Sequence, residues 1–202
     1  MKRARTNRVK AAADCIGTLR DGEQVFAVTE GQFSKLDALL HVLQQAGPAR
    51  VTLWCWTIAE HDIAEIERLY AEGAIVGADL LIDESFRTAR EYGPSALRKW
   101  AELFGEGSVK LAKNHAKMML VSSSTHRVVM RSSMNPNLNS RFENIDVSTC
   151  PAQHAFYRGA FDAMPALSLT ASCEDVRHAS QTGATPSLSS IPAFKNLRRF
   201  SV

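Results

Sequence analysis

The clearest pattern in this chain lies in the segment NHAKMMLVSSSTHRVVMRSSMNPNLNSRFEN, residues 114–144. Two apolar runs, 117–121 and 127–130, have the length and composition of short buried strands. Between them lies the polar stretch 122–125, Ser-Ser-Ser-Thr, which is typical of a tight turn. The segment therefore predicts a β-hairpin, followed by a loop rich in asparagine and a further strand over 145–148.

Five side chains of this segment would meet at one end of the predicted hairpin. His115 and Lys117 are two residues apart, so on a strand they share a face. The hairpin returns Ser133 and Asn135 to that end, and Glu143 precedes the next strand. Lysine and asparagine bind phosphate oxygens, histidine attacks phosphorus or moves a proton, and a carboxylate can orient the histidine. The set indicates phosphodiester chemistry, although each residue alone also suits a strand end or a turn.

Upstream of this segment, apolar periodicity predicts helices and strands in alternation. A helix begins after Ser34, which forms an approximate capping box with Asp37, and it ends at Gly47-Pro48. The remaining predictions are strands over 51–56, 74–82 and 109–112 and helices over 59–72, 94–104 and 152–164. Such alternation is typical of α/β layers.

Composition bounds the class of protein. The chain has 202 residues, 45% hydrophobic and 22% charged, with a net charge of +3, so wholesale disorder, fibrous repeats and a polytopic membrane protein are excluded. The four cysteines have no metal-binding spacing, and neither a signal peptide nor an apolar run long enough to span a membrane is present. We therefore expect a soluble cytoplasmic protein with reduced thiols, no metal and no cofactor.

The two ends differ in composition from the middle. Residues 1–29 form a basic arm and lead-in, in which Lys2, Arg3 and Arg5 either fray in solvent or grip phosphates. Residues 165–202 form a tail rich in Ser, Thr, Ala and Pro. The expected folded domain is 30–164.

The motifs resemble those of the phospholipase D superfamily, whose pattern is HxKxxxxD, then GSxN, then an acidic residue. The match runs through 115–117, 132–135 and 143–144, within a resemblance that covers about 30–164. It is similar to short single-motif members, which include bacterial endonucleases and proteins of phages and mobile elements. The resemblance implies an α/β phospholipase D-like fold, a mixed sheet flanked by helices, with one half-unit per chain.

The resemblance also implies a mechanism. In the family one histidine attacks phosphorus to form a phosphohistidine, a second histidine protonates the leaving oxygen, and no metal is required. Carried over, His115 is the nucleophile or its acid counterpart, Lys117 and Asn135 bind phosphate, Ser133 assists and Glu143 orients His115.

Only one HxK motif is present, so a complete site would need two chains. We expect a homodimer with both His115 residues facing each other across a two-fold axis. The small size, the basic arm and the single motif favour a nuclease over a lipase, with DNA favoured over RNA. Arg131 and Arg141 flank the motif and either grip the nucleic-acid backbone or are ordinary surface arginines.

Two departures keep an alternative open. Ser122 stands at the position of the motif aspartate, and Ser132 at that of the first glycine. A catalytically degenerate protein that binds nucleic acid, or an assembly protein of a phage or mobile element, therefore remains the second hypothesis; a phospholipid transferase is less favoured. Trp54 and Trp56 would share one strand face, where core packing is favoured over base stacking.

Overall fold

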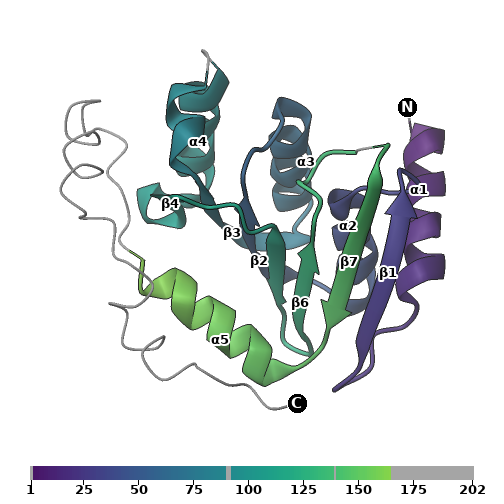
Figure 1. Cartoon of the computed structure of the whole chain (residues 1–202). Coiled ribbons are helices and arrows are strands. Elements are labelled where there is room, and N and C mark those ends of the chain that lie inside the picture. Colours follow the sequence, from purple (N-terminus) through teal and green to yellow (C-terminus); the bar gives the residue numbers. More distant parts are fainter. Residues whose placement is uncertain (1, 90–91, 139, 165–202) are drawn as a thin grey trace.

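The computed structural model describes residues 2–89, 92–138 and 140–164, with side chains from residue 5 onward; the predicted tail 165–202 lies outside the described residues. The described chain forms a seven-stranded sheet in the order β1-β7-β6-β5-β2-β3-β4 (Figure 1). The strands are β1 (Gln24–Glu30), β2 (Ala49–Cys55), β3 (Ile75–Asp83), β4 (Val109–Ala112), β5 (Met118–Ser122), β6 (Arg127–Ser132) and β7 (Phe142–Ser148). Parallel and antiparallel pairs both occur.

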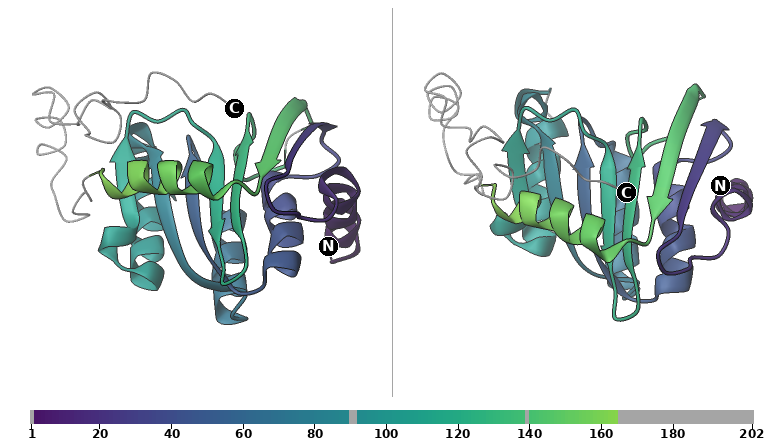
Figure 2. Two further views of the ribbon diagram at one scale, coloured as in Figure 1. Left: turned by 90° about the horizontal axis from the view of Figure 1, so that it is seen from below. Right: turned by 60° about the horizontal axis from the view of Figure 1, so that its bottom comes forward.

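Helices flank both faces of this sheet, which confirms the predicted α/β class. The helices are α1 (Lys2–Ile16), α2 (Lys35–Ala46), α3 (Glu60–Ala71), α4 (Tyr92–Phe104) and α5 (Pro151–Asp162), with two short 3₁₀ helices, η1 (Glu84–Thr88) and η2 (Glu106–Ser108). α2, α3 and α4 cover one face and α1 packs beside α2, whereas α5 lies across the opposite face (Figure 2).

The apolar core follows this division. The larger cluster joins the sheet to α1 through α4 and includes Phe33, Leu39, Leu53, Ile66 and Trp100. A smaller cluster lies under α5 and consists of Trp54, Leu81, Met118, Ala160 and Phe161. Because α5 rests on few apolar side chains, its position depends more on polar contacts than that of α2, α3 and α4.

Strand direction brings many chain segments to one edge of the sheet. β2, β3 and β4 are parallel, and each neighbouring pair from β2 through β5, β6 and β7 to β1 is antiparallel. The last residues of β1, β2, β3, β4 and β6 therefore lie beside the first residues of β5 and β7. α2 follows β1, so it also begins here, and Leu36 N donates to Pro136 O at 3.4 Å. We call this edge the site edge.

The hairpin and the capped helix form as predicted. β5 and β6 pair antiparallel, and Ser123 N donates to His126 O at 3.0 Å to close their turn. At the start of α2 the Ser34 hydroxyl accepts from Asp37 N at 3.1 Å, and the Asp37 carboxylate accepts from Ser34 N at 2.9 Å. This reciprocal capping box satisfies donors that a helix start otherwise leaves without partners.

The N-terminal region contains elements that the sequence reading did not predict. Residues 2–16, taken as part of a basic arm, form α1, and β1 begins within the expected lead-in. Arg8 Nε donates to Asp37 at 2.9 Å, and Arg5 Nη1 lies 3.1 Å from Glu65. Ala12, on the same helix, is buried. These contacts give a polar segment a fixed docking position that apolar periodicity does not reveal.

Candidate active site

The His115–Lys117 segment lies between β4 and β5, at the site edge, and belongs to no strand, because β5 begins one residue later than the sequence predicts. Asn114 holds it there: its backbone N donates to the Asp83 carboxylate at 2.9 Å, and its Nδ2 donates to Cys55 O at 2.9 Å. Asn114 is buried, whereas His115 is exposed. The residue before the motif therefore anchors it to the ends of β2 and β3, and the imidazole projects into solvent.

Lys117 and His115 are in direct contact. Lys117 Nζ lies 3.3 Å from Nδ1 and 3.2 Å from Nε2 of the imidazole, and it donates to His115 O at 3.0 Å. Burial lowers the pKa of Lys117, and the nearby Glu143 carboxylate and Cys55 thiol act in the opposite direction. The ring of Trp56 also lies beside the imidazole, with centroids 5.9 Å apart and planes at 50°.

The second half of the site comes from the loop after β6. The Ser133 hydroxyl donates to the Glu143 carboxylate and accepts from Asn144 N at 3.1 Å. Asn135 Oδ1 accepts from Trp56 N at 3.3 Å. Because Trp56 contacts His115 and Glu143 acts on Lys117, the structure brings all five predicted site residues to the site edge. The orientation of His115 by Glu143 stays a prediction.

Two residues of this edge were not predicted as site residues. Trp56 was expected to pack in the core beside Trp54, but β2 ends at Cys55, so Trp54 is buried under α5 and Trp56 is 48% exposed. Lys35, in the first turn of α2, is fully buried, and burial lowers its pKa to about 7. Nothing local in the sequence distinguishes Lys35 from a solvated lysine that follows a helix cap.

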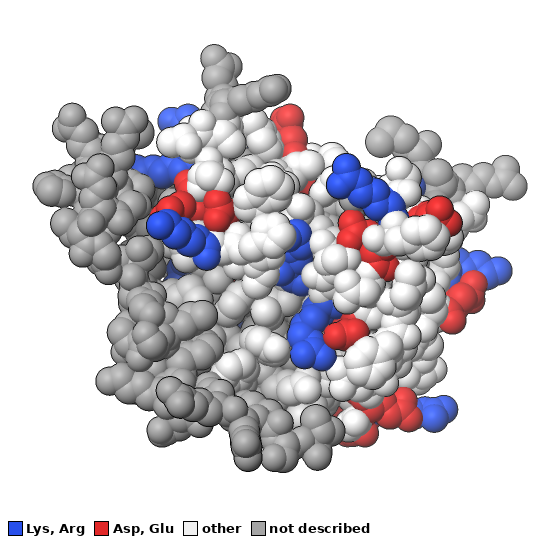
Figure 3. Space-filling view, in the orientation of Figure 1, with Lys and Arg blue, Asp and Glu red and all other residues white. Residues whose placement is uncertain are grey.

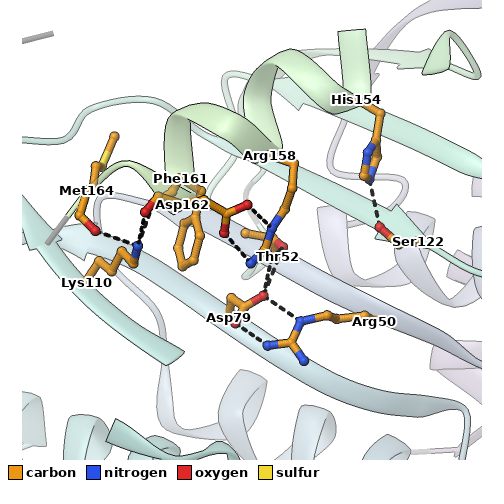
Figure 4. Close-up of polar contacts among 10 residues, drawn as sticks. All are labelled: Arg50, Thr52, Asp79, Lys110, Ser122, His154, Arg158, Phe161, Asp162 and Met164. Atoms are coloured by element: carbon orange, nitrogen blue, oxygen red, sulfur yellow. Dashed lines mark hydrogen bonds and ion pairs between the residues drawn. The ribbon is translucent and has the colours of Figure 1, made fainter. Parts of the chain in front are cut away.

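The two serines that depart from the resembled motif lie in different surroundings. Ser122 is the last residue of β5, at the end of that strand remote from the site edge, and its hydroxyl lies 2.9 Å from His154 Nε2 of α5 (Figure 4). Ser132 lies at the site edge, where its N donates to Lys117 O at 2.9 Å and its hydroxyl donates to Met134 O at 3.2 Å. Only Ser132 bears directly on the shape of the site.

A separate polar network fastens α5 to the sheet (Figure 4). Arg158 of α5 donates to the Asp79 carboxylate, and Arg50 Nε donates to the same carboxylate at 2.8 Å. Burial acts to raise the pKa of Asp79, but these two arginines outweigh it and lower the pKa. Lys110 Nζ donates to Phe161 O at 2.6 Å, at the end of α5. These groups are committed to docking α5 on the face of the sheet opposite α2, α3 and α4 (Figure 2).

The residues predicted to bind nucleic acid are dispersed. Arg131 Nη2 lies 3.1 Å from Asp146, Arg5 is paired with carboxylates of α2 and α3, and Arg141 is exposed. Lys2 and Arg3 belong to α1, but their side chains lie outside the described part. In the view of Figure 3, coloured basic side chains lie beside acidic ones rather than in a continuous stripe.

Among the side chains that the structure describes, no group of three or more His, Cys, Asp or Glu is placed to hold a metal ion. No helix of the described ranges is both long and apolar enough to cross a membrane.

The chain is similar to several solved structures. A phospholipase D family member, Nuc from Salmonella typhimurium, is 15% identical; the match covers 70% of this chain and 93% of that one, with a TM-score of 0.49. NucT from Helicobacter pylori is 15% identical, with coverages of 69% and 94% and a TM-score of 0.48. Polyphosphate kinase from Porphyromonas gingivalis is 14% identical, with coverages of 67% and 25% and a TM-score of 0.50.

The chain shares its fold with this quarter of the polyphosphate kinase. No family model matches the chain, and no curated protein matches it.

Proposed function

We propose that this chain is a metal-independent phosphodiesterase, a nuclease that cleaves DNA at a homodimer interface. One observation carries the proposal: an imidazole, an ammonium, a hydroxyl, an amide and a carboxylate from three separate segments meet at the site edge. These groups are suited to a phosphodiester, since cations and amide donors stabilise the charge that develops on phosphate oxygens.

The proposed reaction has two displacements at phosphorus. His115 attacks phosphorus, the bond to the leaving oxygen breaks, and the His115 of a second copy gives that oxygen a proton. The same second histidine then takes a proton from water, whose oxygen attacks the phosphohistidine and releases His115. Lys117 and Asn135 bind the non-bridging oxygens, and Ser133 with Glu143 supports the loop that carries Asn135.

DNA as the substrate rests on the surroundings of the site. Trp56 exposes an aromatic face beside His115, where a base can stack, and the chain carries a net charge of +3. Arg141, Lys2 and Arg3 are the proposed contacts to the DNA backbone. Arg131 and Arg5 would bind phosphate in competition with the carboxylates that they now contact.

Cleavage of labelled single- and double-stranded DNA in EDTA tests the proposal. We expect the wild type to cleave and His115→Ala to be inactive. His126→Ala is a matched control, because His126 lies in the β5–β6 turn, at the opposite end of that hairpin from His115. Equal cleavage by wild type and His115→Ala would refute the histidine assignment.

The second candidate is a protein that binds nucleic acid without cleaving it. Ser132 favours it, because a side chain at the position of the motif glycine occupies space next to the loop that carries Asn135. Salt-sensitive DNA binding with no cleavage would support this candidate. Neither cleavage nor binding would favour an assembly protein on the same fold.

A further inference from the structure

Lys35 is a buried cation without a partner. It is 0% exposed, and its Nζ has no hydrogen-bond acceptor among the residues that the structure describes. Lys110 provides the contrast: it is also buried, but its Nζ donates to Phe161 O, Asp162 O and Met164 O at the end of α5. An unpaired buried ammonium is strongly unfavourable, so a lysine retained in this setting calls for an anion.

The position of Lys35 links it to the candidate active site. The charged or titratable groups that act on it are Cys55, Lys117 and Glu143, all at the site edge. The backbone of the next residue, Leu36, contacts the loop after β6, which carries Asn135.

The charges around Lys35 do not balance. Lys117 adds a second cation, and Glu143 is the one carboxylate that acts on Lys35 among the described residues. Cys55 is neutral at physiological pH, because burial raises the pKa of its thiol to about 12. Asp37, two residues further along α2, faces Arg8 and Arg5 of α1 instead. A single negative charge at the site edge would restore the balance.

We propose that Lys35 is a buried counter-charge for the phosphodiester bound at His115, Lys117 and Asn135. This inference rests on the proposed function and adds a sixth residue to its site. The titration of Lys35 supports the geometry, because burial lowers its pKa to about 7 and a bound anion would favour the charged form. Binding of the diester should therefore draw a proton onto the protein near neutral pH.

Binding of bis(p-nitrophenyl) phosphate to the full chain tests the inference by titration calorimetry. The ligand stays a monoanion across the pH range, and the His115→Ala background prevents turnover and removes the imidazole as a titrating group. We expect this background to bind more tightly near pH 6 than near pH 9, with proton uptake revealed by buffers of different ionisation enthalpy. Lys117 and Glu143 remain as the other titratable groups in contact with the site.

The deciding comparison adds Lys35→Met to that background. We expect affinity near pH 6 to fall about tenfold and its pH dependence to disappear, because the change removes one charge next to the diester. Lys110→Met, a buried lysine under α5, should leave affinity unchanged. Unchanged affinity in the Lys35→Met protein would overturn the inference and leave the proposed function intact. Should that variant fail to fold, absence of proton uptake in the His115→Ala protein overturns the inference.

One outcome would refute the proposed function as well as the role of Lys35. In the wild type, binding of the diester is measured by its inhibition of DNA binding. If the diester binds neither the wild type nor His115→Ala at any pH, the phosphate site itself is refuted. The proposed function then fails together with the role of Lys35.

Discussion

Ser122 stands where the resembled motif has an aspartate, and its surroundings show what this position does. It is five residues beyond Lys117, so a strand rise of about 3.3 Å per residue separates the two by roughly 16 Å. Its hydroxyl meets His154 of α5, on the side of the sheet remote from α2. The position thus belongs to the docking of α5, and a serine there does not argue against catalysis.

Ser122→Ala should reduce stability without reducing cleavage. The substitution leaves the buried His154 Nε2 without its partner, which lowers the free energy of unfolding by about 1–2 kcal/mol. Urea denaturation of wild type and variant measures this change, and the DNA cleavage assay supplies the second readout. A large loss of cleavage in a stably folded variant would show that Ser122 acts on the site.

Lys35→Met should raise stability, in contrast to most core substitutions. The pKa of Lys35 is about 7 in the folded chain and 10.5 in the reference state. Burial of the charged form therefore lowers the free energy of unfolding below pH 10.5, and this loss reaches its full size below pH 7. Removing the charge should raise the free energy of unfolding by up to about 4 kcal/mol near pH 6 and by almost nothing near pH 11. Urea denaturation at both pH values checks the sign, and equal effects at both would contradict it.

Local spacing explains which site residues the sequence could predict. His115 and Lys117 are two residues apart just before β5, and a short hairpin brings Ser133 and Asn135 back to them, so all four follow from nearby residues. Lys35 lies some 80 positions upstream and reaches the site only because β1 and α2 fold against the same edge. Trp56 was misassigned because alternation holds only while a strand continues, and β2 stops one residue earlier.

At the scale of elements, α5 differs from α2, α3 and α4 in what holds it. Its apolar contacts are few, and much of its attachment comes from the Arg158–Asp79 pair, Lys110 and His154. Burial lowers the pKa of His154 to about 4, with Arg127 and Arg158 acting in the same direction. His154 is therefore neutral at pH 7, and acid places a charge on this buried ring.

Acid should loosen α5. The pKa of His154 is lower in the folded chain than its reference value of 6.5, so the unfolded state binds the proton more strongly. Stability contributed by the neutral ring is present above about pH 6.5 and falls by about 2 kcal/mol as the pH drops toward 4. Urea denaturation between these values measures the slope, and His154→Gln should flatten it. An unchanged slope in that variant would assign acid sensitivity to another group.

α1 shows why some elements could not be predicted. Its sequence is basic and has no apolar stripe, so the helix buries little more than Ala12 and Ile16. Arg5 and Arg8 instead meet carboxylates of α2 and α3 that lie 29 or more positions away. α2, in contrast, carries its own capping box and leucine periodicity, and its boundaries follow from local sequence alone.

At the scale of the whole molecule, a part of the sheet that no described helix covers lies next to the site. Phe26 and Val28 on β1 and Phe142 on β7 are 70%, 66% and 74% exposed, and the β1–β7 register places them on the same face. α5 contacts β5 and β6, so it leaves this corner of the sheet uncovered (Figure 2). Phe142 directly precedes Glu143, so a second copy seated here would lie beside the site.

Mixing active and inactive chains tests whether two copies share one site. If each cleavage needs both His115 residues, an equal mixture of wild type and His115→Ala, unfolded and refolded together, forms wild-type pairs in about a quarter of the dimers. Activity should therefore fall to about a quarter of that of the same total amount of wild type, whereas independent sites would retain about half. Mixing with His126→Ala should retain full activity. Retention of half would refute the shared site.

Phe142→Glu, introduced into the otherwise wild-type chain, should weaken association of the two copies rather than the chemistry. Its cleavage activity should therefore be lowered most at low protein concentration.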